Sequence, residues 1–542
     1  MNNMRRNILL TIAMVAASAL YAQKDSLNAV IQVENEYTPV VTKAAKKGFT
    51  PSTEENSATK PLELEFSQSA TPFKGFTGER DVNDLLPKQN GNYPGYARLG
   101  YGTGSNIDAK LSYLFNISEK DKLNAVASLE GFNSNINSPI GKWDSRFYSS
   151  WAGAEYSHKF DRMTLKSNVE FSDNVFNFNS NFPSDKQNVQ KIHFGTSIAS
   201  QLAGPFAYDF GVRFSRNHYK HTPFLWNYSD EDAGSFNENT IGADARLTYE
   251  FTNDVWRNVA VGISLNNYSY TGTCDYKNVT EFNLSPTTDI KTGNLNIRLG
   301  AQLNMQTRGT FLAIAPDIDI EATINDKVTA YTSIKGNREA ACFETLELIS
   351  PYWSCYTQPK PKYTIADITT GVRISSNNLS TDIFAGYAYT KNDIMGYAIP
   401  DLQVGGVDCT IVQENTTHAY IGARAGFDHE GWLKLSTTAK YNYWRCNTYS
   451  YLATRPEFEF AFNGEVRPVE DIYISLTYSF ATYAHDDASL NKNELNLRTS
   501  YKFANRFSAF VEGNNLLNRT YVKYAGYYEQ GINALIGLSA SF

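Results

Sequence analysis

The five cysteines are the residues of this chain that can take part in the most kinds of chemistry, and all lie in or beside long predicted loops. They are Cys274, Cys342, Cys355, Cys409 and Cys446. Cys342 and Cys355 lie within one loop, so in an oxidising compartment these two thiols are predicted to form a disulfide. The alternative is that the cysteines remain free thiols at the ends of strands. Their spacing matches no zinc-site pattern, and we expect neither a bound metal nor another cofactor.

Aromatic side chains in two long loops form a second group of candidate contact residues. One loop carries Phe224 and Trp226, and the other carries Tyr352, Trp353 and Tyr356. Exposed aromatic rings on loops stack on sugars or anchor a partner protein. The alternative is that these rings pack the loops onto one another or belong to the outer aromatic girdle of a membrane protein.

Signatures of catalysis are missing from the sequence. It has no Gly-x-Ser-x-Gly element, no His-Glu-x-x-His element and no phosphate-binding glycine loop. His218 and His221 are three residues apart, which on a strand directs the two rings to opposite faces. The formal net charge of −7 disfavours a nucleic-acid partner. We therefore expect a protein that is not an enzyme and does not bind nucleic acid.

The N-terminus predicts export from the cytoplasm. Arg5 and Arg6 precede an apolar run over residues 8–20 that is too short to span a bilayer. Cleavage of a signal peptide, residues 1–22, is predicted between Ala22 and Gln23. No run of about 18 apolar residues follows, so the mature chain is predicted to be secreted or inserted into a membrane as strands.

The remaining chain divides into two segments that differ in composition and in the pattern of apolar residues. Residues 23–92 contain scattered prolines and polar filler, which predicts an extended, loosely ordered segment in the periplasm or the lumen. From 93 to 542, runs of about 9 to 15 residues alternate between apolar and polar side chains and are separated by turn residues. We count about 22 such runs, and bacterial single-chain barrels require an even number.

The connections between these runs alternate between short and long. Short connections include 161–162 and 325–326, whereas 134–145, 220–237, 338–362 and 393–416 are long. Transmembrane barrels have short periplasmic turns and long extracellular loops. The pattern therefore predicts an all-β protein, a transmembrane antiparallel β-barrel over residues 93–542, in the bacterial outer membrane.

The end of the chain resembles the end of TonB-dependent receptor barrels. Residues Glu512–Tyr521 read EGNNLLNRTY, and Tyr527 and Gly531 lead into a closing strand that ends at Phe542. The resemblance implies a barrel of 22 strands. Because only residues 23–92 are available ahead of the barrel, the chain resembles receptor-like barrels that lack a full plug domain.

A barrel of this width has a lumen that something must fill. The candidates are residues 23–92, inward-folded loops and a partner protein, and we predict that residues 23–92 lie partly in the lumen. The preferred function is solute transport across the outer membrane. The alternatives are a non-conducting barrel that acts as a scaffold in a multi-protein outer-membrane assembly, and a hydrolase. Expected partners are outer-membrane lipid, outer-membrane or periplasmic proteins, and the barrel-assembly machinery, which would act through the C-terminal strand ending at Phe542.

Overall fold

The computed structural model describes most of residues 93–542. The described ranges are 93–138, 141–179, 186–200, 204–224, 234–253, 255–273, 276–400, 406–429, 431–483 and 491–542. The predicted signal peptide with its cleavage site at Ala22 and Gln23, the segment 23–92, Trp226 and Cys274 all lie outside these ranges.

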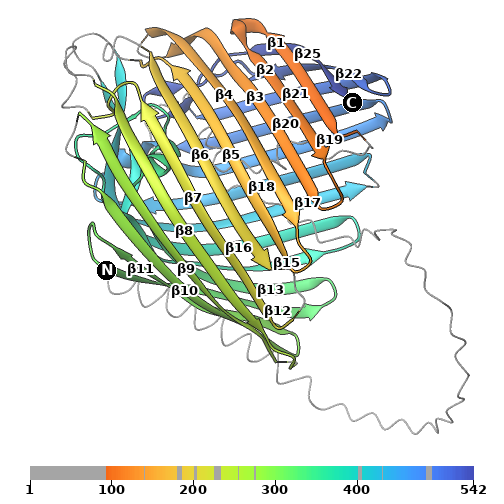
Figure 1. Cartoon of the computed structure of the whole chain (residues 1–542). Coiled ribbons are helices and arrows are strands. Elements are labelled where there is room, and N and C mark those ends of the chain that lie inside the picture. The colour runs from red at the N-terminus through yellow and green to blue at the C-terminus, as the bar shows by residue number, and fades with distance from the viewer. Residues whose placement is uncertain are drawn as a thin grey trace, which may run out of the picture. The chain divides into compact units, whose positions relative to one another are not determined.

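Within the described ranges, 22 long strands form an antiparallel sheet that closes into a β-barrel (Figure 1). Consecutive long strands pair with one another, and β1 pairs with β25 to close the cylinder. Closure gives every strand two partners and leaves no free sheet edge. The long strands are β1 (Gly95–Gly102), β2 (Ile107–Asn116), β3 (Asp121–Ser138), β4 (Gly141–Lys159), β5 (Met163–Phe176), β6 (Gln187–Ser200), β7 (Phe206–Tyr219), β8 (Phe236–Glu250), β9 (Trp256–Gly272), β10 (Val279–Thr292), β11 (Leu295–Gln306), β12 (Leu312–Asn325), β13 (Val328–Glu339), β15 (Lys362–Ser375), β16 (Leu379–Pro400), β17 (Val407–His429), β18 (Leu433–Arg445), β19 (Pro456–Val469), β20 (Ile472–Tyr483), β21 (Lys492–Ala504), β22 (Phe507–Asn514) and β25 (Asn533–Ser541).

Short elements occupy the connections between these strands. They are η1 (Thr103–Ser105), α3 (Phe343–Glu347), β14 (Trp353–Ser354), η3 (Tyr449–Thr454), β23 (Val522–Tyr524) and β24 (Tyr527–Tyr528). In the part of the chain that the structure describes, no helix is long and apolar enough to cross a membrane.

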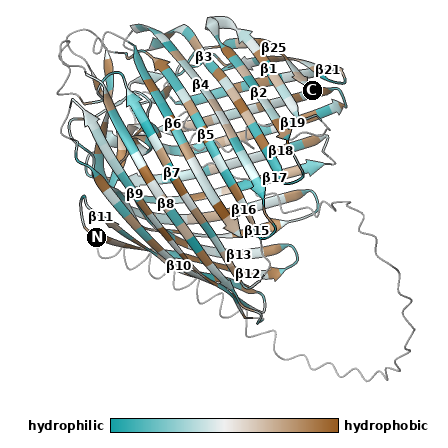
Figure 2. Ribbon diagram, viewed as in Figure 1, coloured by the Kyte–Doolittle hydropathy of each residue, from teal (hydrophilic) through white to brown (hydrophobic). Residues whose placement is uncertain are grey.

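The two faces of each strand meet different surroundings, which explains the period of two in the sequence. On β7, Phe210, Val212 and Phe214 are exposed, whereas Ser215 and Asn217 on the alternate face are buried. Figure 2 shows the resulting alternation of hydrophobic and hydrophilic residues along the strands. Exposed apolar rows outside and polar rows inside are the arrangement of a barrel that spans a membrane. The predicted 22-strand transmembrane barrel is thus confirmed.

The lumen below the extracellular end is lined by charged pairs on the inward faces. Arg298 pairs with Asp289 at 2.9 Å, and Arg373 of β15 pairs with Glu321 of β12 at 2.8 Å. Each of these four side chains is partly exposed, as hydrated ions in a wet lumen should be.

Long and short connections lie at opposite ends of the barrel, as predicted. The turns at 326–327, 470–471 and 505–506 lie at the end where β1 starts and β25 stops, whereas residues 340–361 and 515–532 lie at the other end. The end with short turns is the periplasmic one.

Two predicted long loops are instead mostly strand. The predicted loop 393–416 is a hairpin in which residues 393–400 of β16 pair with residues 407–414 of β17. In the predicted loop 134–145, residues 134–138 likewise belong to β3 and residues 141–145 to β4. Alternation is weak in the first hairpin because Ile394 and Met395, on opposite faces, are both buried against protein.

Candidate functional site

Residues 340–361, between β13 and β15, turn inward at the extracellular end; we call them the cap segment. Its helix α3 contacts side chains of β6, β7 and β8. Its strand β14 pairs in parallel with β17, where Trp353 lies opposite Cys409. The cap segment therefore joins separate parts of the barrel wall.

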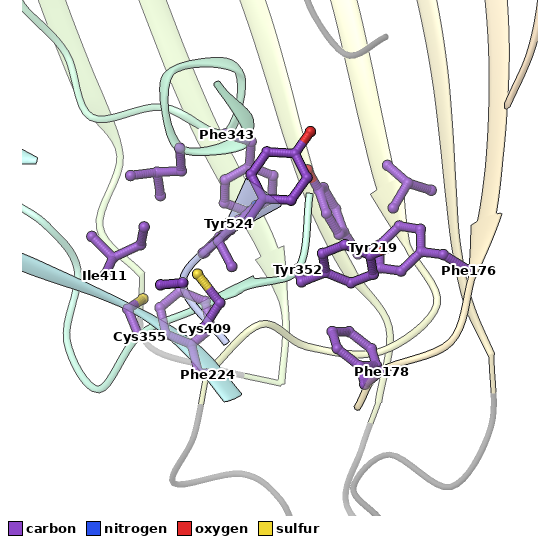
Figure 3. Close-up of a cluster of buried hydrophobic side chains, with 14 of the residues drawn as sticks. Phe176, Phe178, Tyr219, Phe224, Phe343, Tyr352, Cys355, Cys409, Ile411 and Tyr524 are labelled. Atoms are coloured by element: carbon purple, nitrogen blue, oxygen red, sulfur yellow. The ribbon is translucent and has the colours of Figure 1, made fainter. Parts of the chain in front are cut away.

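The cap segment is held by a single cluster of buried apolar side chains (Figure 3). Strands β4–β8, β16 and β17 contribute to this cluster, as do the cap segment and the connection between β22 and β25. We call it the cap cluster. Its members are Phe147, Phe176, Phe178, Val189, Tyr219, Phe224, Phe236, Tyr276, Ala341, Phe343, Leu346, Tyr352, Trp353, Cys355, Ile394, Cys409, Ile411, Tyr524, Ala525 and Tyr527.

Phe343 lies among several rings of the cap cluster. It is fully buried, and its ring centroid lies 4.8 Å from that of Tyr219, 5.1 Å from that of Phe236 and 5.3 Å from that of Trp353. The contact with Tyr219 is edge-on, which is a favoured geometry for aromatic pairs. Burying a side chain of this size stabilises the docked cap by about 1.5–3 kcal/mol.

Charged groups also fix α3 against the wall. The Glu347 carboxylate pairs with the Lys191 ammonium and accepts a hydrogen bond from the Tyr219 hydroxyl. At the start of the helix, the Phe343 N–H donates to Glu238 Oε2 at 2.9 Å. Burial raises the pKa of the Glu347 carboxyl, and the nearby Lys191 opposes that rise.

A chamber of about 290 Å³ lies between the cap segment, the wall at β2–β4 and β21–β25, and residues 523–530. Aromatic side chains form part of its lining. Tyr352 stacks on Tyr527 at 3.9 Å with nearly parallel rings, and Trp143 meets Tyr527 edge-on at 5.2 Å. The cap segment therefore forms part of the chamber lining through Tyr352.

Carboxylates in the chamber lining are neutralised by neighbouring cations. Glu512 pairs with Arg498 at 3.2 Å, and Glu529 pairs with Lys523 at 2.6 Å. Burial lowers the pKa of Lys523, but Glu529 more than compensates, so the pKa lies above its ordinary value. Aromatic rings beside fixed polar groups are the features of a small-molecule site.

The structure separates the predicted aromatic contact residues into two groups. Phe224, Tyr352 and Trp353 are buried in the cap cluster, so these three pack the loops onto one another. Tyr356 is 54% exposed and is the described residue of the set that is open to a partner. Trp226 lies outside the described ranges.

The disulfide predicted between Cys342 and Cys355 is not formed in the structure. Cys342 is a free buried thiol at the start of α3, and burial raises its pKa well above the usual range. Cys355 instead lies beside Phe224 in an isolated bridge. The helix α3 and the turn after it lie between these two residues in the chain, and the pairing stays a prediction.

Sequence reasoning missed Lys191, Tyr219 and Glu347. Lys191 and Glu347 are 156 residues apart in the chain, and each reads alone as a solvated charge. Across the described ranges, no group of three or more His, Cys, Asp or Glu side chains is arranged to hold a metal ion.

No protein-family model and no curated protein matches the sequence. Similar solved structures include the siderophore receptor PirA of Acinetobacter baumannii, with a TM-score of 0.65 at 10% identity over 84% of this chain and 81% of that one. The ferric enterobactin receptor PfeA of Pseudomonas aeruginosa in complex with enterobactin has a TM-score of 0.63 at 10% identity, covering 83% and 81%. The copper transporter OprC has a TM-score of 0.63 at 11% identity, covering 84% and 82%.

These likenesses lie at low sequence identity and concern the fold. They agree with the resemblance of residues 512–542 to the end of TonB-dependent receptor barrels, and with the apolar outer face of the cylinder. The chain is an outer-membrane β-barrel with the fold of TonB-dependent receptors.

Proposed function

We propose that this barrel carries a solute across the outer membrane and that the cap segment is its extracellular gate. The observation that carries the proposal is the cap cluster, in which one loop joins separate parts of the barrel wall at the extracellular end. Similar structures include a siderophore receptor and a copper transporter, which supports a role in transport.

The energetics of the cap favour a gate that stays closed without a ligand. Several rings with the burial of Phe343 each contribute about 1.5–3 kcal/mol, so the undocked state is rare. A solute shifts this equilibrium only by binding the two states differently. The chamber offers such a site, because Tyr352 and Tyr527 belong both to its lining and to the cap cluster.

A closed mouth also fits a second function, that of a non-conducting scaffold in an outer-membrane assembly. In that case the cap stays docked, and the exposed parts of the loops, such as Tyr356, contact partner proteins. Current through the wild-type pore distinguishes the two functions.

Single-channel recording in planar bilayers tests the gate. Wild-type protein should show a closed baseline with brief openings, and a variant in which a flexible linker replaces residues 341–359 should stay open. The matched control is Tyr356→Ala, in the same segment but 54% exposed, which should behave as wild type. A silent linker variant would contradict the gate. A silent wild-type protein with stably co-purifying partners would favour the scaffold.

Removing residues 23–92 from both proteins tests the proposal that this segment lies in the lumen. If it does, the linker variant should conduct more after the removal. Unchanged conductance would contradict a lumenal position for this segment.

A further inference from the structure

A groove on the lipid-facing side of the barrel has a floor of small residues. Ala125 and Ala127 of β3 lie opposite Ala154 and Ala152 of β4 in the strand register. All four side chains are on the outward face, since Val126 between the first two is on the inward, buried face. Strands β2–β5 lie side by side in Figure 1.

Large side chains form both walls of this groove. On β2, Leu111 lies opposite Ala127 and Tyr113 opposite Ala125. On β5, Phe171 lies opposite Ala152 and Val169 opposite Ala154.

The C-terminal residue extends the first wall. The Phe542 ring packs over Gly95, where a Cβ atom would meet it, and stacks on Tyr113 at 5.9 Å. The groove has a volume of about 650 Å³.

The width of the groove limits which kind of molecule can reach its floor. The strands that form the walls, β2 and β5, are three strand spacings apart, or about 14 Å between backbones, and the wall side chains narrow this gap further. A transmembrane helix, with a diameter of about 10–12 Å, is too wide to reach the alanine floor. A hydrocarbon chain is narrow enough, and the groove is continuous with the apolar surface that already faces lipid.

Polar groups follow the floor strands toward the periplasmic end. Four register positions beyond the pair of Ala125 and Ala154, Asp121 lies opposite His158. The Tyr156 hydroxyl donates to Asp121 Oδ1 at 2.6 Å, and His158 Nδ1 lies 2.6 Å from the same oxygen. These polar residues share the outward face of the alanines. An apolar groove followed along the same strands by hydrogen-bonding groups matches the tail and headgroup of a lipid. We propose that this groove binds one acyl chain of a phospholipid in the periplasmic leaflet.

Native mass spectrometry tests this site. Protein reconstituted into vesicles of phosphatidylethanolamine and phosphatidylglycerol is extracted in mild detergent, and the fraction that retains one phospholipid is measured. The double variant Ala127→Leu/Ala152→Leu fills the groove and should lower that fraction at least tenfold. The control is Ala243→Leu, because Ala243 of β8 also faces outward but lies between the large side chains of Val212 and Leu265. This control should retain lipid as wild type does.

Heat-modifiable migration on a gel verifies that each variant is folded, and Ala152→Leu alone serves if the double variant is not. Equal retention in all three proteins, or no retained lipid in wild type, would overturn the proposal. A change of oligomeric state in the double variant with unchanged lipid retention would also overturn it, because the groove would then contact a second copy of the chain.

Discussion

The cap cluster and the part of the lumen lined by the pairs Arg298–Asp289 and Arg373–Glu321, which we call the lower lumen, lie in the same barrel. Their ion pairs differ in exposure to water. In the lower lumen, Arg373 and Glu321 form an ion pair with side chains that are 49% and 40% exposed. Under the cap, Lys191 and Glu347 form a pair that is 9% and 1% exposed. Both pairs join a carboxylate to a cation, but water screens the first and is excluded from the second. An exposed pair contributes about 0–1 kcal/mol, whereas a buried ion that loses its partner costs about 3–5 kcal/mol.

The two regions also differ in how firmly they are held in place. Lumenal strands are held by two ladders of backbone hydrogen bonds each, whatever their side chains do. The cap segment has the two-residue ladder of β14 with β17 and the isolated bridge of Cys355 with Phe224, so it depends largely on its side chains. Substitutions in the cap should therefore release one segment and leave the barrel closed.

The largest effect is expected from Phe343→Asp. This change removes a fully buried ring and puts a charge in its place, so undocking should be favoured by more than about 5 kcal/mol. Hydrogen exchange should show loss of protection in residues 340–361, while heat-modifiable migration remains. The control Leu348→Asp, at a position that is 40% exposed in the same segment, should keep the cap protected. Retained protection in Phe343→Asp would contradict a cap held by side-chain burial.

Lys191→Met should have the next largest effect. It leaves the Glu347 carboxylate buried without its cation, which costs about 3–5 kcal/mol of docking free energy. The double variant Lys191→Met/Glu347→Gln removes both charges and should recover most of the loss. Hydrogen exchange of the cap segment gives the docking free energy for each corner of this cycle, and an additive result would show that the pair is not coupled.

Cap docking should also depend on pH through Glu347. Its pKa in the docked state is raised above the ordinary value of 4.5, so the stabilisation is fully present below about pH 4.5 and is lost as pH rises through the docked pKa. Exchange in residues 340–361, corrected for intrinsic rates, should be slower at pH 4.5 than at pH 7. Glu347→Gln should flatten this profile, and an unchanged slope would assign the dependence to another group.

A smaller effect is expected from Tyr527→Phe. The Tyr527 hydroxyl accepts a hydrogen bond from the Asn179 N–H at 3.2 Å, and its loss costs about 0.5–1.5 kcal/mol. The ring remains, so the stack on Tyr352 should persist. Modestly faster exchange near residue 527 with unchanged exchange in α3 is the expected result. Equal loss in both places would show that the two loops undock as one unit.

The barrel could be predicted from the sequence because each strand residue reports its own surroundings. Phe210 and Val212 face lipid, Ser215 and Asn217 face the lumen, and this difference appears directly as a period of two. The cap could not be predicted, because its contacts join residues that are distant in sequence. Nothing local to Lys191 or Glu347 indicates a pair, and the short spacing of Cys342 and Cys355 favours a bond that the structure does not form.

The smallest effect is expected from Arg373→Gln in the lower lumen. Both members of its pair with Glu321 are partly exposed, so the change should alter the free energy of unfolding by less than about 1 kcal/mol. The midpoint of heat-modifiable unfolding should therefore move little. Because Glu321 remains hydrated, no buried charge is left without a partner. In the linker variant that lacks the cap, however, removing one positive charge from the lumen should shift ion selectivity toward cations. Reversal potentials in a salt gradient measure this shift. If Arg373→Gln instead destabilised the barrel as strongly as Lys191→Met undocks the cap, the lower lumen would have to be as dry as the cap cluster.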